Sequence, residues 1–249
     1  MGSVDICVML GLNSGMDKLK RSNDRKVANS LTIAGNSRIK NTFGLPAGKE
    51  FSCPGATSVC EKICYAGKLE NLYPGVRESL THNWDLLKSA DFDTMVNLLQ
   101  VMINEFSREC EKWDAPKLFR IHWDGDFFNS IYTWAWRKVI EESPDVKFWV
   151  YTRVEEAAIL LNGIENLSLY FSTDRDNGPA AARVAKQGIR LAGLGQTFKE
   201  ARDLITSLSG QRSAICPELR KQIPLTGACV SCNICPRGTA NITFSISKK

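Results

Sequence analysis

The chain has 249 residues, of which 43% are hydrophobic and 24% are charged. This ordinary globular composition excludes collagen-like and intrinsically disordered proteins, and a chain of this length can bury one sizeable core. The formal net charge of +5 is too small to indicate a nucleic-acid-binding protein by itself. The nine cysteines are the unusual feature of the composition.

The cellular compartment determines how these cysteines are interpreted. No segment has the run of about 18 to 20 apolar residues that a membrane-spanning helix needs. Residues 1–12 lack the basic start of a secretory signal, so we expect a cytoplasmic protein without a membrane association. Structural disulfides are rare in a reducing cytoplasm. The cysteines are therefore candidates for metal ligands or catalytic thiols.

We expect a single domain with four consecutive parts. These are an N-terminal segment (1–34), a first cluster loop with three cysteines (35–75), a core of strands and helices (76–215) and a C-terminal cysteine segment (216–249). Prolines and glycines between residues 34 and 66 predict a long loop. Loops of that length inside a compact domain are usually functional.

The core reads as repeated strand and helix. Apolar residues at helical spacing predict two helices within 76–113, broken near Ala90 and Asp91. Strands are expected at 117–123, 147–153, 167–173, 189–192 and 213–216, and helices at 131–142, 155–161, 180–187 and 198–208. With a strand near 31–34, this makes about six βα units and an α/β fold. A partial or irregular (β/α) barrel suits that number, and a flat doubly wound sheet is the alternative.

Three of the expected strands carry polar residues on one face. The residues that share these faces are Arg120, His122 and Asp124 in the first strand, Tyr151 and Arg153 in the second, and Ser172 and Asp174 in the third. The opposite, apolar faces should contact the covering helices. Ligands of parallel α/β folds bind at the carboxyl ends of the strands. The pattern favours a functional cavity over polar groups that merely satisfy one another.

Four cysteines near the C-terminus form a candidate metal site. Cys216, Cys229, Cys232 and Cys235 are spaced C-x12-C-x2-C-x2-C. A C-x2-C-x2-C run is typical of iron–sulfur proteins because adjacent thiolates can reach different irons of one cluster. Zinc sites more often have two separated C-x2-C pairs. We expect a 4Fe-4S cluster here, with a four-cysteine zinc site as the alternative.

A second group lies in the first cluster loop. Cys53, Cys60 and Cys64 are spaced C-x6-C-x3-C. Three thiolates on a four-iron cluster would leave one iron open to an exogenous ligand, as a catalytic metal site requires. A fourth ligand from a distant residue, or one irregular site that uses all seven cysteines, is the alternative. Cys7 and Cys110 stand alone, and a buried thiol is the default for Cys110.

The chain contains eight distinctive short segments, at residues 35–40, 45–47, 52–57, 60–66, 120–127, 148–153, 172–174 and 229–235. Together these segments resemble the bacteriophage "gene product 88"-like family. The likeness spans most of the chain. It implies a phage origin, and hence the host cytoplasm as the location, more than it implies an activity.

The layout is also distantly similar to the radical S-adenosylmethionine (SAM) superfamily. That superfamily holds a three-cysteine, four-iron cluster in a loop of a partial barrel, and SAM binds the open iron. The resemblance implies that Asp124, Gly125 and Asp126 contact SAM, together with Ser172 and Asp174. Catalytic roles would then fall to His122, Asp124, Asp126, Tyr151 and Arg153. The sequence departs from the usual C-x3-C-x2-C spacing, and Asp126 replaces the usual glutamate.

Three functions remain open from the sequence. The first is an iron–sulfur enzyme that activates SAM or another small molecule. The second is a non-catalytic cluster protein that transfers electrons or binds a host protein, and the third is a zinc-stabilised phage protein. A basic run between Lys18 and Lys26 is expected to be a solvated face, with nucleic-acid binding as the alternative.

Overall fold

The computed structural model describes residues 17–247, so Cys7 and the first 16 residues of the N-terminal segment lie outside the described part. Six parallel strands form one sheet in the order β1-β2-β3-β4-β6-β5. Their bounds are β1 (Leu118–Ile121), β2 (Lys147–Thr152), β3 (Leu167–Thr173), β4 (Arg190–Gly195), β5 (Ser213–Ile215) and β6 (Asn241–Ser245). The sheet is open, because β1 and β5 lie at its edges and no pairing in residues 17–247 closes it into a barrel.

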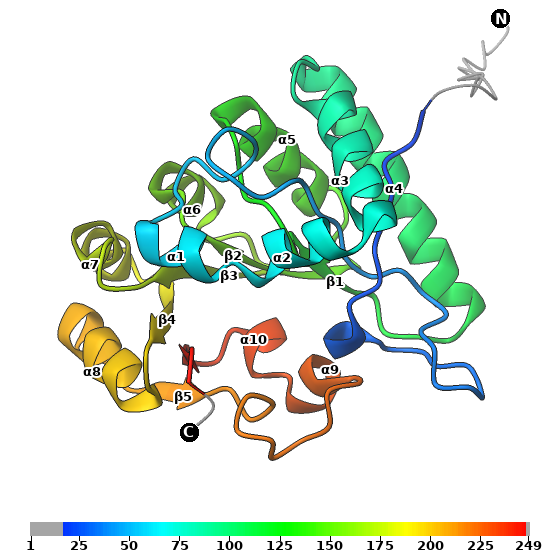
Figure 1. Cartoon of the computed structure of the whole chain (residues 1–249). Coiled ribbons are helices and arrows are strands. Elements are labelled where there is room, and N and C mark those ends of the chain that lie inside the picture. Colours follow the sequence, from blue (N-terminus) through cyan, green and yellow to red (C-terminus); the bar gives the residue numbers. More distant parts are fainter. Residues whose placement is uncertain (1–16, 248–249) are drawn as a thin grey trace, which may run out of the picture.

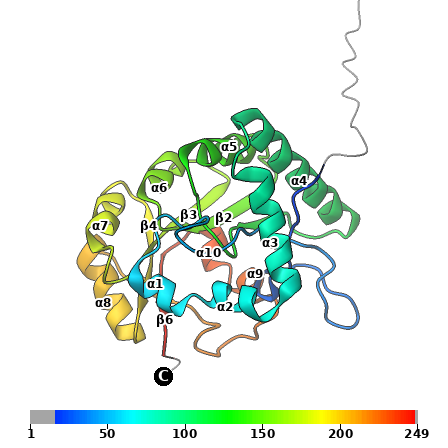
Figure 2. The same cartoon turned by 45° about the horizontal axis from the view of Figure 1, so that its top comes forward.

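Four helices cover one face of the sheet in a continuous arc (Figures 1 and 2). They are α5 (Ser130–Glu141), α6 (Glu155–Leu161), α7 (Gly178–Lys186) and α8 (Phe198–Ser209), and each contacts the next. The opposite face is covered by α9 (Ala228–Cys232) and α10 (Ile234–Arg237), of which α10 contacts β2 and β3. The C-terminal cysteine segment therefore packs on the inner face of the sheet.

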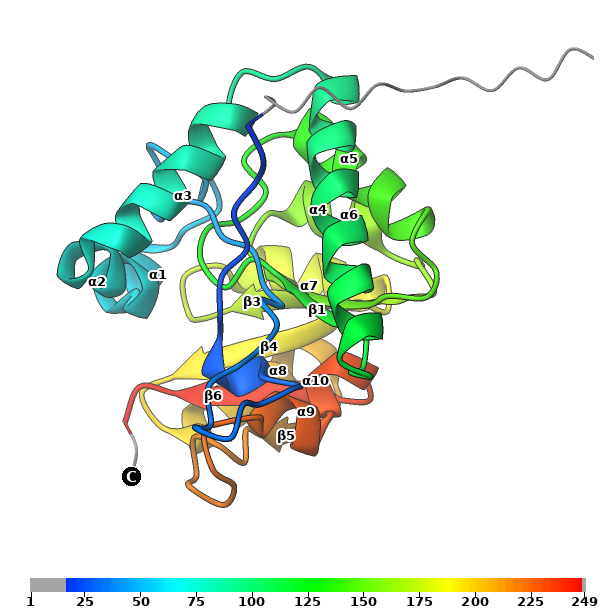
Figure 3. The same ribbon diagram turned by 90° about the vertical axis from the view of Figure 1, so that its right-hand side faces the viewer.

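The remaining helices belong to the N-terminal half of the chain. They are η1 (Arg25–Val27), α1 (Ser58–Ile63), α2 (Tyr65–Leu72), α3 (Pro74–Leu87) and α4 (Phe92–Lys112). Figure 3 shows α1 and α2 in a different part of the molecule from α9 and α10. The expected long loop therefore contains two short helices. None of the helices within residues 17–247 is long and apolar enough to cross a membrane.

The two faces of each strand separate as the alternation predicts. Phe148, Val150 and Phe171 belong to the main core beneath the arc of helices. Trp149 and Tyr170 face the other way and pack beside cysteines of the C-terminal segment. The predicted polar face is therefore real, but α10 fills much of it and leaves less open space than the pattern indicates.

Most of the predicted elements are confirmed, and the differences have local causes. The two helices within 76–113 are α3 and α4. The first strand ends at Ile121 because His122 has a φ of +57°, outside the β region. The prediction of a strand at 31–34 is wrong, since Leu31 forms only an isolated bridge with Ser37. Strand β6 is absent from the predicted elements, although it lies between β4 and β5.

Gly193 and Gly195 mark a close packing contact. A Cβ atom on Gly193 would lie 2.7 Å from the side chain of Ile205, and one on Gly195 would lie 2.7 Å from the backbone nitrogen of Ala201. Both contacts are with α8. These glycines therefore allow the helix to approach the end of β4.

Candidate functional site

The first cysteine of the loop group is held against the end of β1. The backbone N–H of Cys53 donates to the carbonyl of Gly48 at 2.9 Å, and the hydroxyl of the preceding Ser52 donates to the carbonyl of Pro46 at 2.6 Å. A Cβ on Gly125 would lie 2.5 Å from that hydroxyl oxygen. Gly125 also has a φ of +80°, which favours glycine. Because Gly125 has no side chain, the turn that contains Ser52 and Cys53 can pack against it.

The other two loop cysteines lie where two short helices meet. Thr57 precedes α1, and its hydroxyl oxygen accepts the N–H of Cys60 at 3.0 Å. Cys64 precedes α2, and its sulfur accepts the N–H of Gly67 at 3.3 Å. Side-chain caps of this kind satisfy N–H groups that have no partner within the helix. The capping interactions therefore fix the positions of Cys60 and Cys64.

A buried ion pair ties α1 to the carboxyl ends of β2 and β3. A guanidinium nitrogen of Arg153 lies 2.7 Å from Oδ2 of Asp174, and the two side chains are only 11% and 0% exposed. The hydroxyl of Thr57 donates to the same carboxylate oxygen at 2.7 Å. The loop also approaches closely, since a Cβ on Gly55 would lie 2.6 Å from the carbonyl oxygen of Arg153. The structure thus brings Arg153 and Asp174 to the loop cysteines, in agreement with the strand pattern.

Both carboxylate oxygens of Asp126 accept hydrogen bonds at the same edge of the sheet. Its Oδ1 accepts the hydroxyl of Thr152 at 2.6 Å and the N–H of Phe127 at 2.8 Å, and its Oδ2 accepts the N–H of Arg153 at 2.8 Å. Burial raises the pKa of this carboxyl to about 6 despite these hydrogen bonds. Asp126 therefore joins β1 to β2. Ser172 contributes its carbonyl oxygen, which accepts the side-chain amide of Asn177 at 2.9 Å.

The electrostatics of the loop thiols reflect these neighbours. Burial, and then the charge of Asp126, raise the pKa of Cys53 to about 12. Burial also raises the pKa of Cys60, whereas the guanidinium of Arg153 opposes the shift. The charge of Cys64 acts on Cys60 as well. The interactions place Cys60 beside Cys64 and Arg153, and Cys53 beside Asp126.

The four C-terminal cysteines converge under the inner face of the sheet. Burial raises the pKa of Cys235 to about 12, and the charges of Cys229, Cys216 and Cys232 add to the shift. The chain turns between α9 and α10 at Asn233, which adopts a left-handed conformation with a φ of +55°. This turn brings together cysteines from the end of β5, from α9 and from α10.

Tyr151 contacts this second group rather than the first. Its hydroxyl is hydrogen-bonded to Cys235, and its ring lies 5.4 Å from the ring of Tyr170. Burial raises the pKa of the Tyr151 hydroxyl well above its usual value. The resemblance to radical SAM enzymes implies a catalytic Tyr151 beside the loop cysteines, whereas the alternation of the strand directs it to the C-terminal cysteines.

Two other predicted site residues are separated from each other. His122 is 3% exposed and lies in an aromatic cluster, where a ring nitrogen is hydrogen-bonded to the hydroxyl of Tyr132 at 2.9 Å. Its positive φ turns the side chain away from the face that Arg120 occupies. Asp124 instead lies beside Glu70 on α2, and burial followed by that carboxylate raises the pKa of Asp124 to about 8. The structure thus places His122 in the aromatic cluster and Asp124 beside α2.

Arg120 lies between the two cysteine groups, although the sequence assigns it no role in the site. Its guanidinium pairs with Asp24 at 2.6 Å, donates to the hydroxyl of Tyr65 at 3.5 Å and lies 5.7 Å from the ring centre of Tyr151. Its charge also acts on Cys229. Tyr65 follows Cys64 directly in the chain, so Arg120 connects the surroundings of both groups. Its place on the polar strand face is the signal in the sequence that indicates this position.

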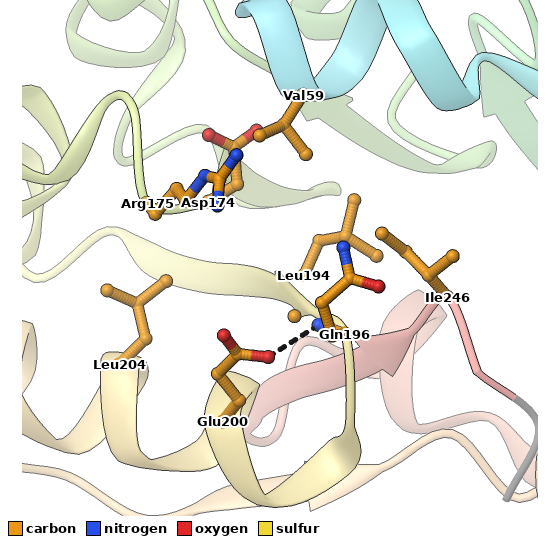
Figure 4. Close-up of a pocket in the computed structure, with 9 residues that line it drawn as sticks. Val59, Asp174, Arg175, Leu194, Gln196, Glu200, Leu204 and Ile246 are labelled. Atoms are coloured by element: carbon orange, nitrogen blue, oxygen red, sulfur yellow. Dashed lines mark hydrogen bonds between the residues drawn. The ribbon is translucent and has the colours of Figure 1, made fainter.

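A small pocket of about 110 Å³ lies at the carboxyl ends of β3 and β4, beside α1. Figure 4 shows Val59, Asp174, Arg175 and Gln196 among the residues that line it. The carboxylate of Glu200 accepts the N–H of Gln196 at 2.7 Å and holds the floor of the pocket. Val59 directly precedes Cys60 in the chain, and Asp174 pairs with Arg153, but none of the three loop cysteines lines the pocket itself.

The free cysteines are the candidate metal ligands of the part of the chain that the structure describes. Within residues 17–247, no group of three His, Cys, Asp or Glu side chains is arranged to hold one metal ion. The eight cysteines of that range are all free.

The basic run of the N-terminal segment is largely paired within the chain. Lys18 pairs with Glu105 at 2.6 Å, Arg21 pairs with Glu109 at 2.6 Å, and Lys26 pairs with Glu218 at 2.7 Å. These pairs reduce the charge that would be available to nucleic-acid phosphates.

Comparisons with known proteins agree with the resemblance seen in the sequence. The model of the family described as "Gene product 88" matches residues 17–238. The chain is 47% identical over 244 residues to the "Gene 88 protein" of Mycobacterium phage L5, and 46% identical over 245 residues to that of Mycobacterium phage D29. Each alignment covers 94% of this chain and all of the relative. No solved structure matches, and the likeness to radical SAM enzymes receives no support. The chain belongs to the gene product 88 family of bacteriophages.

Proposed function

We propose that this protein binds two 4Fe-4S clusters. Cys216, Cys229, Cys232 and Cys235 would hold one of them, and the three loop cysteines Cys53, Cys60 and Cys64 would hold the other. The observation that carries the proposal is the closeness of cysteines in two places. Under the inner face of the sheet, the charges of Cys229, Cys216 and Cys232 act on Cys235, and at the carboxyl ends of the strands the charge of Cys64 acts on Cys60. We interpret that sheet as a partial (β/α) barrel, with the arc from α5 to α8 as its outer layer.

The surroundings of each group support clusters. Thiolates buried without a counter-charge are unfavourable, and a bound cluster removes that cost. At the C-terminal group, the hydroxyl of Tyr151 donates to Cys235, and hydrogen bonds to sulfur tune a cluster's potential. At the loop group, the guanidinium of Arg153 lies beside Cys60. Bound clusters would supply one-electron transfer.

Metal analysis of the full chain, purified without oxygen, tests the proposal. We expect about eight irons and eight sulfides per chain and little zinc. Cys235→Ser and Cys60→Ser should each lose about half of the iron. Cys110→Ser is the matched control, because Cys110 is buried in the hydrophobic core and its thiol donates to the carbonyl of Pro116. Bound zinc without sulfide, or full iron in the Cys60 variant, would contradict the assignment.

A second candidate function is small-molecule activation at the loop cluster, with SAM as the class of ligand. The pocket lined by Val59 and Asp174 favours this candidate, because Val59 directly precedes Cys60 and the loop group has only three cysteines. We expect SAM to change the electron paramagnetic resonance signal of the reduced protein and to be cleaved. An unchanged signal would leave a non-catalytic electron carrier or host-protein ligand as the function of the clusters.

A further inference from the structure

A second cavity, larger than the pocket beside α1, lies at the amino ends of the strands, away from the loop cysteines. Its volume is about 310 Å³, against about 110 Å³ for the pocket beside α1. Its walls come from the start of β2, the turn that precedes β3, the turn that precedes β4 and the end of α10. Small-molecule sites in proteins begin at about 300 Å³. The cavity is therefore large enough for a small ligand.

The charged lining of this cavity is predominantly basic. Lys147, Arg190 and Arg237 line it, and Glu165 is the one carboxylate in the lining. Among residues 17–247, none of the three cations forms an ion pair, although the ammonium of Lys147 donates to the backbone carbonyl of Glu165 at 3.4 Å. The cavity therefore carries an excess of positive charge that no ion pair within the described part of the chain neutralises.

Two of these cations act on each other. Burial lowers the pKa of Lys147, and the charge of Arg190 lowers it further. Arg190 is held beside the backbone at the end of α10, where a Cβ on Gly238 would lie 3.1 Å from its guanidinium nitrogen. Two like charges held near each other repel, and an anion bound between them would attract both and offset that repulsion.

Phosphate is the anion that this arrangement fits best. Guanidinium groups bind phosphate oxygens through two parallel N–H donors, and a lysine adds a mobile point charge. We propose that the cavity binds a small molecule that carries one or two phosphate groups, through Lys147, Arg190 and Arg237. None of these three residues is a proposed cluster ligand, although Arg237 shares α10 with Cys235.

Calorimetric titration of the full chain with inorganic pyrophosphate tests this proposal, with sodium chloride at matched ionic strength as the blank. Lys147→Gln and Arg237→Gln should each weaken pyrophosphate binding by about tenfold or more, since each removes a charged hydrogen-bond donor. Arg202→Gln is the matched control, because Arg202 is exposed on α8 and lies outside the cavity lining. Circular dichroism and thermal melting confirm that each variant is folded.

The outcomes separate the sources of the phosphate. Saturable pyrophosphate binding that is lost in both cavity variants and kept in the control supports the proposal. Binding that Arg202→Gln weakens equally would show general charge attraction and overturn it, and so would the absence of saturable binding at about 10 mM pyrophosphate. Titration with a single-stranded oligonucleotide is the last measurement. If the oligonucleotide binds through these residues while pyrophosphate does not, the small-molecule assignment is wrong.

Discussion

Asp174→Asn tests whether the buried ion pair with Arg153 anchors the loop cysteines to the sheet. The substitution keeps the size of the side chain and removes its charge. Arg153 and Thr57 both donate to Oδ2 of Asp174, and the N–H of Asp176 donates to Oδ1, so an amide N–H₂ group would face a donor in either orientation. The guanidinium would remain largely buried without its counter-charge.

The burial of the two groups sets the expected size of the effect. Removing one partner of a buried ion pair costs about 3–5 kcal/mol. Arg153 retains an exposure of 11%, so some solvent reaches its charge and we expect the lower end, about 3 kcal/mol. In a protein of about this size, 1 kcal/mol corresponds to about 2–4 °C in melting temperature. The variant should therefore melt about 6–12 °C below the parent protein.

Urea unfolding followed by tryptophan fluorescence, together with thermal melting, measures this loss. Asp203→Asn is the matched control, because Asp203 pairs with Lys199 on the surface of α8 and is 64% exposed. Exposed pairs contribute little to stability, so the control should behave like the parent. If Asp174→Asn and Asp203→Asn were equally stable, the anchoring role of the buried pair would be refuted.

Three further substitutions probe the same region. Thr57→Val should cost about 1–2 kcal/mol, because it removes both the cap of α1 and a donor to Asp174; equal urea midpoints for variant and parent would contradict this. Gly125→Ala should cost at least about 1–2 kcal/mol, since a left-handed conformation disfavours a Cβ that would also meet Ser52; a stabilised protein would show that the turn is free to move. Burial, with a contribution from Arg120, lowers the pKa of His122 to about 3, so the unfolded state binds more protons between about pH 6.5 and 3. The free energy of unfolding should therefore fall as the pH falls through that window. In His122→Asn, whose asparagine tolerates a positive φ, the free energy of unfolding should depend less steeply on pH between 7 and 4. An equally steep dependence in this variant would show that other groups cause the loss.

The periodicity of the chain determined much of the fold. The alternation in 147–153 and 167–173 is enough to assign Phe148 and Phe171 to the helix-covered face, and both lie in that core. A period of two residues leaves no other arrangement for a strand that is covered by helices. Helical spacing likewise located α3 and α4. Strand β6 has only five residues, which are too few for the periodicity to distinguish a strand from a loop.

The local grouping of the cysteines was also readable from the sequence, because short spacings limit how far apart the thiols can lie. The surroundings of each group were not readable. The side chain of His122 does not share the face of Arg120, because its φ angle is positive, and the sequence pattern does not indicate that angle. Glu70 lies beside Asp124, and Arg120 contacts Tyr65, through contacts between segments that are distant in the chain.

The sequence by itself thus determined the class of fold, the two faces of its strands, the family and the two groups of candidate metal ligands. Only the tertiary structure decided that the sheet stays open, that Tyr151 belongs to the C-terminal cysteines, and that Lys147, Arg190 and Arg237 surround one cavity. The physical reason is the range of the interactions. Periodicity and spacing act between near neighbours in the chain, whereas sites form where distant segments meet.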